Sequence, residues 1–166
     1  MNSFRSTDQS EAAATALLES VFGDIEHLKL PVDIDRIVRH CQLTVLQGQF
    51  GRKNVIGELD RQKRQIKLVK SNSFQDKNFI AAHELGHFKL HHESFEIMHA
   101  PLSDILDGSK DAREREADRF AASLTMPEAR IRKWWNLTSN LTLLAQVFGV
   151  PKVAVFYRLK QLNLIK

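Results

Sequence analysis

Two histidines and a glutamate lie close together in the stretch His83-Glu84-Leu85-Gly86-His87. On a helix, residues four apart lie on the same face, one turn apart, so both imidazoles could bind one metal ion. Zinc commonly takes histidine nitrogen, and a catalytic zinc keeps one position for water. Glu84 could accept a proton from that water and pass it to a leaving amine, while the small Gly86 would let another element approach closely. The pattern predicts a zinc-dependent hydrolase, against the alternative of two helical histidines without metal.

A third ligand is expected on a downstream helix, predicted from about Lys110 to Leu124. The buried face of this helix is predicted from its apolar residues, which are Ala117, Phe120, Ala121 and Leu124. Glu114 lies at one edge of that face, and Asp118 lies beside it one turn later. This placement suits a metal ligand and a residue that orients a ligand, respectively. Alternatively, both acids only keep the helix soluble and pair with neighbouring arginines.

Three further histidines, His91, His92 and His99, are predicted to lie around the site or on the surface. His91 continues the four-residue spacing of His83 and His87. However, eight residues of helix span about 12 Å, so His83 and His91 cannot share one ion.

Hydrophobic periodicity and the turn residues predict the elements that must position these side chains. The expected helices cover Gln9–Phe22, Pro31–Cys41, Phe74–His91, Lys110–Leu124, a segment from Pro127, Leu141–Phe148 and Lys152–Leu162. The expected strands are Leu43–Leu46, Val55–Leu59 and Gln65–Val69, with a hairpin turn over residues 61–64. Along the chain, helices are followed by strands of a small sheet and then by more helices. This order predicts an α+β fold with an antiparallel sheet packed on a helical core. A C-terminal helical hairpin follows this core.

Two stretches, Ala81–His92 and Glu114–Pro127, resemble the ImmA/IrrE family of zinc metallopeptidases. Residues 31–33 and Gly57 match more weakly. The resemblance implies a zincin-like peptidase core over residues 1–128, followed by a helix-turn-helix-like segment over 129–166 that packs on it as one domain.

The resemblance also implies one zinc ion per chain, bound by His83, His87 and Glu114, with Glu84 as general base. The chain departs from the family at Asp118, where Asn is usual, and at Thr125, where Leu is usual. An aspartate can still orient a ligating histidine, so the first departure leaves the expected site intact.

Members of this family look like dedicated proteases that cut or otherwise inactivate helix-turn-helix repressors. The expected function is therefore a zinc-dependent endopeptidase that inactivates such a repressor and so derepresses mobile-element or stress-response genes. One alternative is a DNA-binding regulator with a structural metal. Another is a metal-bound protein that sequesters its partner without cutting it.

The charge of the chain is unevenly distributed. The net charge is +4, yet the segment after Glu128 contains no acidic residue. Its basic residues are Arg130, Arg132, Lys133, Lys152, Arg158, Lys160 and Lys166. We expect Lys152, Arg158 and Lys160 to dock an acidic protein substrate. The alternatives are direct DNA binding by the last two helices and a merely solvated basic face.

The sequence predicts a cytoplasmic protein without a membrane span. Cys41 is the only cysteine, which excludes an internal disulfide. The first ten residues lack the apolar core of a secretion signal, and polar residues interrupt the longest apolar stretch, residues 141–156.

Overall fold

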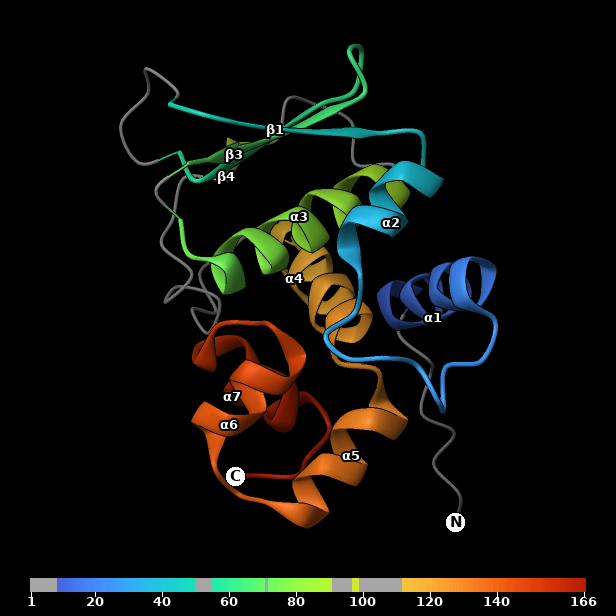
Figure 1. Ribbon diagram of the computed structural model, residues 1–166, viewed down its shortest axis with the longest axis vertical. Helices are drawn as coiled ribbons and strands as arrows, with labels where there is room; N and C mark the ends of the chain where they lie inside the picture. The colour runs from blue at the N-terminus through green and yellow to red at the C-terminus, as the bar shows by residue number, and fades with distance from the viewer. Residues whose placement is uncertain (1–8, 50–54, 71, 91–96, 99–111) are drawn as a thin grey trace.

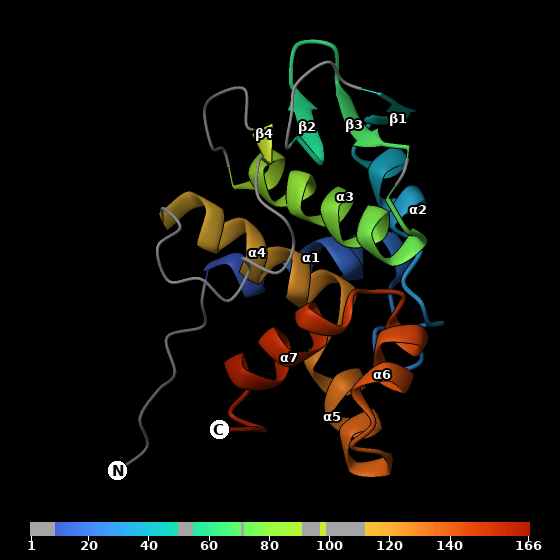
Figure 2. The ribbon, with the colours of Figure 1, turned by 90° about the vertical axis from the view of Figure 1, so that its left-hand side faces the viewer.

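The computed structural model describes residues 9–49, 55–70, 72–90, 97–98 and 112–166, which form helices layered on one small sheet. The sheet is the outermost layer, and α3 (Phe74–Lys89) lies across its inner face (Figure 1). Helix α4 (Ala112–Thr125) packs on α3, and α1 (Gln9–Phe22) packs on α4. The three C-terminal helices lie at the end of the molecule opposite the sheet (Figure 2). This arrangement confirms the predicted α+β class.

The sheet has four strands among the described residues, in the order β1-β3-β2-β4. Their bounds are β1 (Thr44–Gly48), β2 (Gly57–Asp60), β3 (Gln65–Val69) and β4 (Ile97–Met98). Strand β2 pairs antiparallel with β3 and with β4, but β1 pairs parallel with β3. The expectation of an antiparallel sheet is therefore wrong for this pair. The chain reverses twice between β1 and β3, so the two strands run the same way. Side-chain alternation indicates the faces of a strand and not its neighbours.

Helix α3 packs on the inner face of β2 and β3. Leu59, Ile66 and Leu68 are buried on these strands. The side chain of Ser73 accepts a hydrogen bond from the backbone N–H of Asp76 at 3.1 Å and caps the start of the helix. A run of α3 residues from 79 to 87 is buried, so the helix is covered both by the sheet and by other helices.

Helix α4 approaches α3 closely at Gly86. A Cβ atom at Gly86 would lie 3.1 Å from the Ala117 Cα and 3.2 Å from the Ala117 carbonyl oxygen. Only glycine leaves room for the α4 backbone at this distance without a shift of one helix. The structure thus confirms the expected close approach and places the start of α4 beside the histidines of α3.

Helix α2 (Ile34–His40) begins three residues after the predicted start at Pro31. The side chain of Asp33 accepts a hydrogen bond from the Arg36 backbone N–H at 2.8 Å and so acts as the N-cap. The helix therefore begins after Asp33, because an N-cap side chain satisfies a free backbone N–H of the first turn.

The C-terminal segment folds into α5 (Glu128–Leu137), α6 (Leu141–Phe148) and α7 (Lys152–Gln161), close to the predicted bounds. Buried side chains of α6 and α7 belong to the same hydrophobic cluster as those of α3 and α4. The division into residues 1–128 and 129–166 stays a prediction. None of the described helices has the length and apolar character needed to cross a membrane.

Arg158 lies inside the molecule and ties α7 to α1 and to the residue that follows α4. Its Nη2 donates to Glu11 Oε1 at 2.8 Å, its Nε to the Met126 carbonyl at 3.1 Å, and its Nη1 to Gln161 Oε1 at 3.3 Å. Because Arg158 is only 1% exposed, the prediction that it docks a partner is wrong. The charge count of the sequence could not distinguish a buried arginine from a surface one.

Candidate metal centre

Helices α3 and α4 pack against each other (Figure 2). The side chains of His83, His87 and Glu114 meet at this contact. The Nε2 atom of His83 lies 3.3 Å from Glu114 Oε2, and the Nε2 atom of His87 lies 3.1 Å from Glu114 Oε1. The two Nε2 atoms are 3.0 Å apart. One potential ligand atom from each residue lies within 4.8 Å of the others. The structure therefore brings together the three residues that the sequence predicts as ligands.

His83 is oriented by Asp118, one turn after Glu114 on α4. The His83 Nδ1 atom lies 2.9 Å from Asp118 Oδ1, and both side chains are buried. Burial opposes protonation of the imidazole, but hydrogen bonds to Asp118 and Glu114 and nearby negative charges outweigh it. Together they raise the pKa of His83 from 6.5 to about 10. The site therefore favours a positive charge at this position.

Glu114 connects the site to solvent, since its side chain is 22% exposed while the two histidines are buried. Partial burial raises the pKa of Glu114, but hydrogen bonds and charge from His83 and His87 outweigh it. The pKa of this carboxyl is held well below its ordinary range. Glu114 is thus a carboxylate at neutral pH and can serve as an anionic ligand.

Glu84 is fully buried beside the sheet. Its Oε1 atom lies 3.2 Å from the position that a Cβ on Gly57 would occupy, and that Cβ would also lie 2.4 Å from Ile80 Cγ2. A larger residue at position 57 would push into both side chains. Gly57 therefore leaves the space in which the Glu84 carboxylate lies, which gives this glycine of β2 a physical role.

The donor set fits a divalent metal ion. Two imidazole nitrogens and one carboxylate oxygen form a known combination for catalytic zinc, which leaves a position for water. His83 also has its second nitrogen bonded to a carboxylate, the usual arrangement for a metal-binding histidine. These contacts indicate a metal-binding group without identifying the ion.

The other residues singled out in the sequence have different outcomes. His91, His92 and His99 lie outside the described residues. Thr125 is buried, and its hydroxyl donates to the Ala121 carbonyl at 2.7 Å, so this departure from the family leaves no polar group unpaired. Lys152 and Lys160 are exposed on α7, as a docking role requires.

Sequence reasoning missed Arg61, which reads only as part of a hairpin turn. Its guanidinium donates to the backbone carbonyl of His87 and, at 3.5 Å, to that of Phe88. No periodicity or motif marks this contact, because it joins a turn to a helix end across 26 residues.

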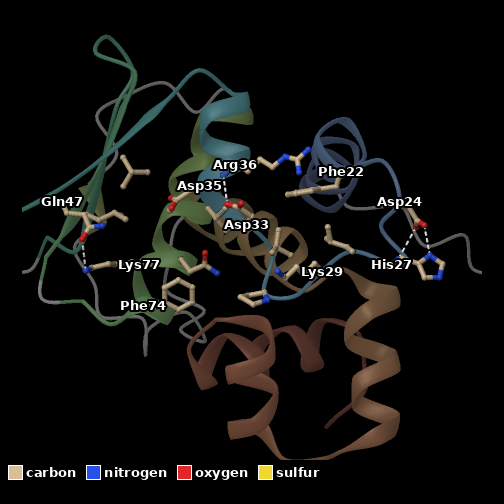
Figure 3. Close-up of a pocket in the computed structure, with 18 residues that line it drawn as sticks. Phe22, Asp24, His27, Lys29, Asp33, Asp35, Arg36, Gln47, Phe74 and Lys77 are labelled. Carbon is tan, nitrogen blue, oxygen red and sulfur yellow. Dashed lines mark hydrogen bonds and ion pairs between the residues drawn. The ribbon is translucent and has the colours of Figure 1, made fainter.

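A pocket of about 740 Å³ lies between the segment that precedes α2, strand β1 and the start of α3 (Figure 3). Several of its polar and charged side chains bond to one another. Lys77 donates to Gln47 at 3.0 Å, and Asp24 bonds to His27 at 2.7 Å. The lining includes none of the residues of the candidate metal centre. The pocket is therefore separate from the candidate metal centre at the contact between α3 and α4.

The chain resembles known proteins both in sequence and in fold. Residues 42–160 match the peptidase M78 family, described as the IrrE N-terminal-like domain. Metallopeptidase ImmA of Bacillus subtilis (strain 168) is 26% identical over 124 residues, which cover 74% of this chain and 72% of that protein. A Mycobacterium tuberculosis transcriptional regulator has a similar fold, with a TM-score of 0.64 at 16% identity. That match covers 91% of this chain and 46% of the regulator, so the chain spans about half of its length.

Proposed function

Since the chain belongs to the IrrE N-terminal-like domain family of M78 peptidases, we propose that it is a zinc-dependent endopeptidase acting on a protein substrate. One observation carries the proposal. The possible ligand atoms of His83, His87 and Glu114 lie within 4.8 Å of one another, and Glu84 follows His83 on α3, the helix that carries both histidines. The relative named as a metallopeptidase supports this assignment.

In this proposal, His83, His87 and Glu114 hold the zinc ion, and Asp118 fixes the ring of His83. A bound zinc would polarise the scissile carbonyl and lower the pKa of the attacking water. Glu84 accepts the proton of that water and transfers it to the leaving amine. Burial of Glu84 excludes bulk water, which strengthens its interaction with charges that develop during the reaction.

The Glu84→Gln variant tests this mechanism. Glutamine has nearly the same shape but cannot accept a proton, so zinc content should stay at one per chain while cleavage falls by ~10²-fold or more. The matched control is Glu116→Gln on the exposed face of α4, which should alter neither quantity. Unchanged cleavage in Glu84→Gln would contradict the mechanism. A wild-type chain that binds its partner but never cuts it would favour sequestration.

We also propose that the substrate is a helix-turn-helix repressor in the cytoplasm, docked through the C-terminal helices. Lys152 and Lys160 are exposed on α7, and the segment after Glu128 has no acidic residue to neutralise them. Leu137 is 71% exposed at the end of α5 and adds an apolar contact surface. An acidic partner surface with apolar side chains would complement this face.

A DNA-binding regulator is the second candidate. In its favour, α6 and α7 are two short helices joined by residues 149–151, the spacing of a helix-turn-helix, and α7 carries exposed lysines. The structural neighbour is named a transcriptional regulator, although its low identity supports the fold alone. Specific binding to duplex DNA by this chain would support this candidate.

A further inference from the structure

We propose that Arg61 is a positioning residue for His87. This proposal rests on the function proposed above, in which His87 is a metal ligand. Arg61 follows β2 directly and reaches the C-terminal end of α3. Its Nη2 donates to the His87 carbonyl and its Nη1 donates to the Phe88 carbonyl at 3.5 Å. The guanidinium carbon also lies 5.5 Å from the centre of the Phe88 ring.

The position of His87 near the end of its helix explains why such a contact matters. Helix α3 ends at Lys89, so the His87 carbonyl lies in its last turn, where backbone carbonyls commonly bond to groups from outside the helix. Within this last turn, the Gly86 carbonyl accepts from the Leu90 N–H, and Arg61 covers the next two carbonyls. A cation at this end also complements the helix dipole. Arg61 therefore keeps the turn that carries His87 in helical geometry.

The two histidines are held in different ways. The ring of His83 is fixed by the buried carboxylate of Asp118, well inside the helix. The backbone of His87 is fixed by Arg61, from the sheet. Strand β2 thus touches α3 at two levels: Gly57 lies against Glu84, and Arg61, just after the strand, binds at His87. The sheet sets the position of both the proposed base and one proposed ligand.

Arg64 offers a matched control in the same turn. Its guanidinium carbon lies 5.4 Å from the centre of the same Phe88 ring. However, its N–H groups donate to the carbonyls of Cys41 and Gln42, which follow α2. Both arginines therefore join the hairpin to a neighbouring helix end, but only Arg61 bonds to the backbone of a proposed ligand.

The experiment compares Arg61→Met, Arg61→Lys and Arg64→Met in the full chain, by competition for Zn²⁺ with a chromophoric chelator. Arg61→Met should weaken zinc affinity by about 10-fold, as loss of a residue supporting a metal ligand commonly does. Arg61→Lys keeps a cation at the helix end and should recover part of the loss. Arg64→Met should change affinity by less than about 2-fold. The absorption bands of bound Co²⁺ should shift in Arg61→Met alone, because they report ligand geometry.

Thermal melting of the metal-free proteins separates general destabilisation from positioning. If Arg61→Met and Arg64→Met melt at similar temperatures, a difference in zinc affinity belongs to the site. Unchanged zinc affinity in Arg61→Met, or an equal loss in Arg64→Met, would overturn the inference alone. A wild-type chain that binds no zinc would overturn the proposed function and this inference together.

Discussion

Asp118 and His83 form a buried pair across the contact between α3 and α4, with Oδ1 and Nδ1 2.9 Å apart. The bond commits Nδ1 of His83 to the carboxylate. The Nε2 atom then faces Glu114 at 3.3 Å and is the atom available to a metal ion. Helix α4 thus supplies the proposed ligand Glu114 and also Asp118, which orients the proposed ligand His83 on α3.

This pair predicts how substitutions at position 118 behave. Asp118→Ala should weaken zinc binding by about 10- to 100-fold, because the ring of His83 loses its orienting partner. Asp118→Asn keeps an oxygen acceptor at the same place and should lose much less. Isothermal titration with Zn²⁺ on both variants checks the order. Equal losses in the two variants would show that the carboxylate charge matters more than the hydrogen bond.

The metal-free chain should lose stability as the pH rises. The native pKa of His83, about 10, lies above its ordinary value of 6.5, so the folded state binds this proton more tightly than the unfolded state. The resulting stabilisation is complete below about pH 6.5 and disappears as the pH rises to about 10. Thermal melting in chelator across this range should show the decline.

The control for this pH dependence is His83→Gln, which has no proton to lose at this position. Its melting temperature should vary less between pH 6.5 and 10 than that of the wild type. Zinc affinity should show the opposite trend and increase with pH, because the metal must displace the proton. A wild type whose melting temperature does not fall in this window would contradict the assignment.

Gly86→Ala should disturb the site through the backbone. The new Cβ would lie 3.1 to 3.2 Å from atoms of Ala117 and Phe120, so α4 would have to shift. Overpacking of this kind costs about 1–3 kcal/mol, offset by up to about 1 kcal/mol from the better helix propensity of alanine. Chemical denaturation should show a net loss. Zinc titration should also show weaker binding, because Glu114 moves with α4.

Charge reversal on α7 tests the docking surface. The double variant Lys152→Glu with Lys160→Glu should slow cleavage of the whole protein substrate and leave a short peptide spanning the cut nearly unaffected. Lys29→Glu with Lys70→Glu makes the same change in net charge at exposed residues outside α7 and serves as the control. Specific DNA binding that the α7 variant abolishes, together with unchanged cleavage, would favour the DNA-binding alternative.

Arg158→Met should destabilise the fold. The substitution removes the buried guanidinium and leaves Glu11 and the Met126 carbonyl without their donor. Lost hydrogen bonds to a charged group cost about 1.5–3 kcal/mol each when buried, and less here for Glu11, whose side chain is 30% exposed. Urea denaturation should show the loss, and Glu11→Gln should show a smaller one. A variant as stable as the wild type would contradict this stabilising role of Arg158.

Local signals in the sequence were sufficient for most of the site. The spacing of His83 and His87 and the edge position of Glu114 gave the three clustered residues, and the helix bounds followed from periodicity and caps. Arg158 and Arg61 could not be found this way. Each bonds to backbone or side chains far away in sequence, so its environment is set by how whole elements pack. The parallel pairing of β1 with β3 is likewise a property of chain path, which alternation does not encode.

Helix α4 is enclosed by α1, α3 and α7, which come from the start, the middle and the end of the described chain. No single one of these helices can detach and expose it fully, because the other two remain against it. In hydrogen–deuterium exchange, the backbone amides of α4 from Phe120 to Leu124 should therefore exchange only through global unfolding. Exchange at these amides then measures the stability of the whole molecule, and the proposed ligand Glu114 is anchored to its most slowly opening part.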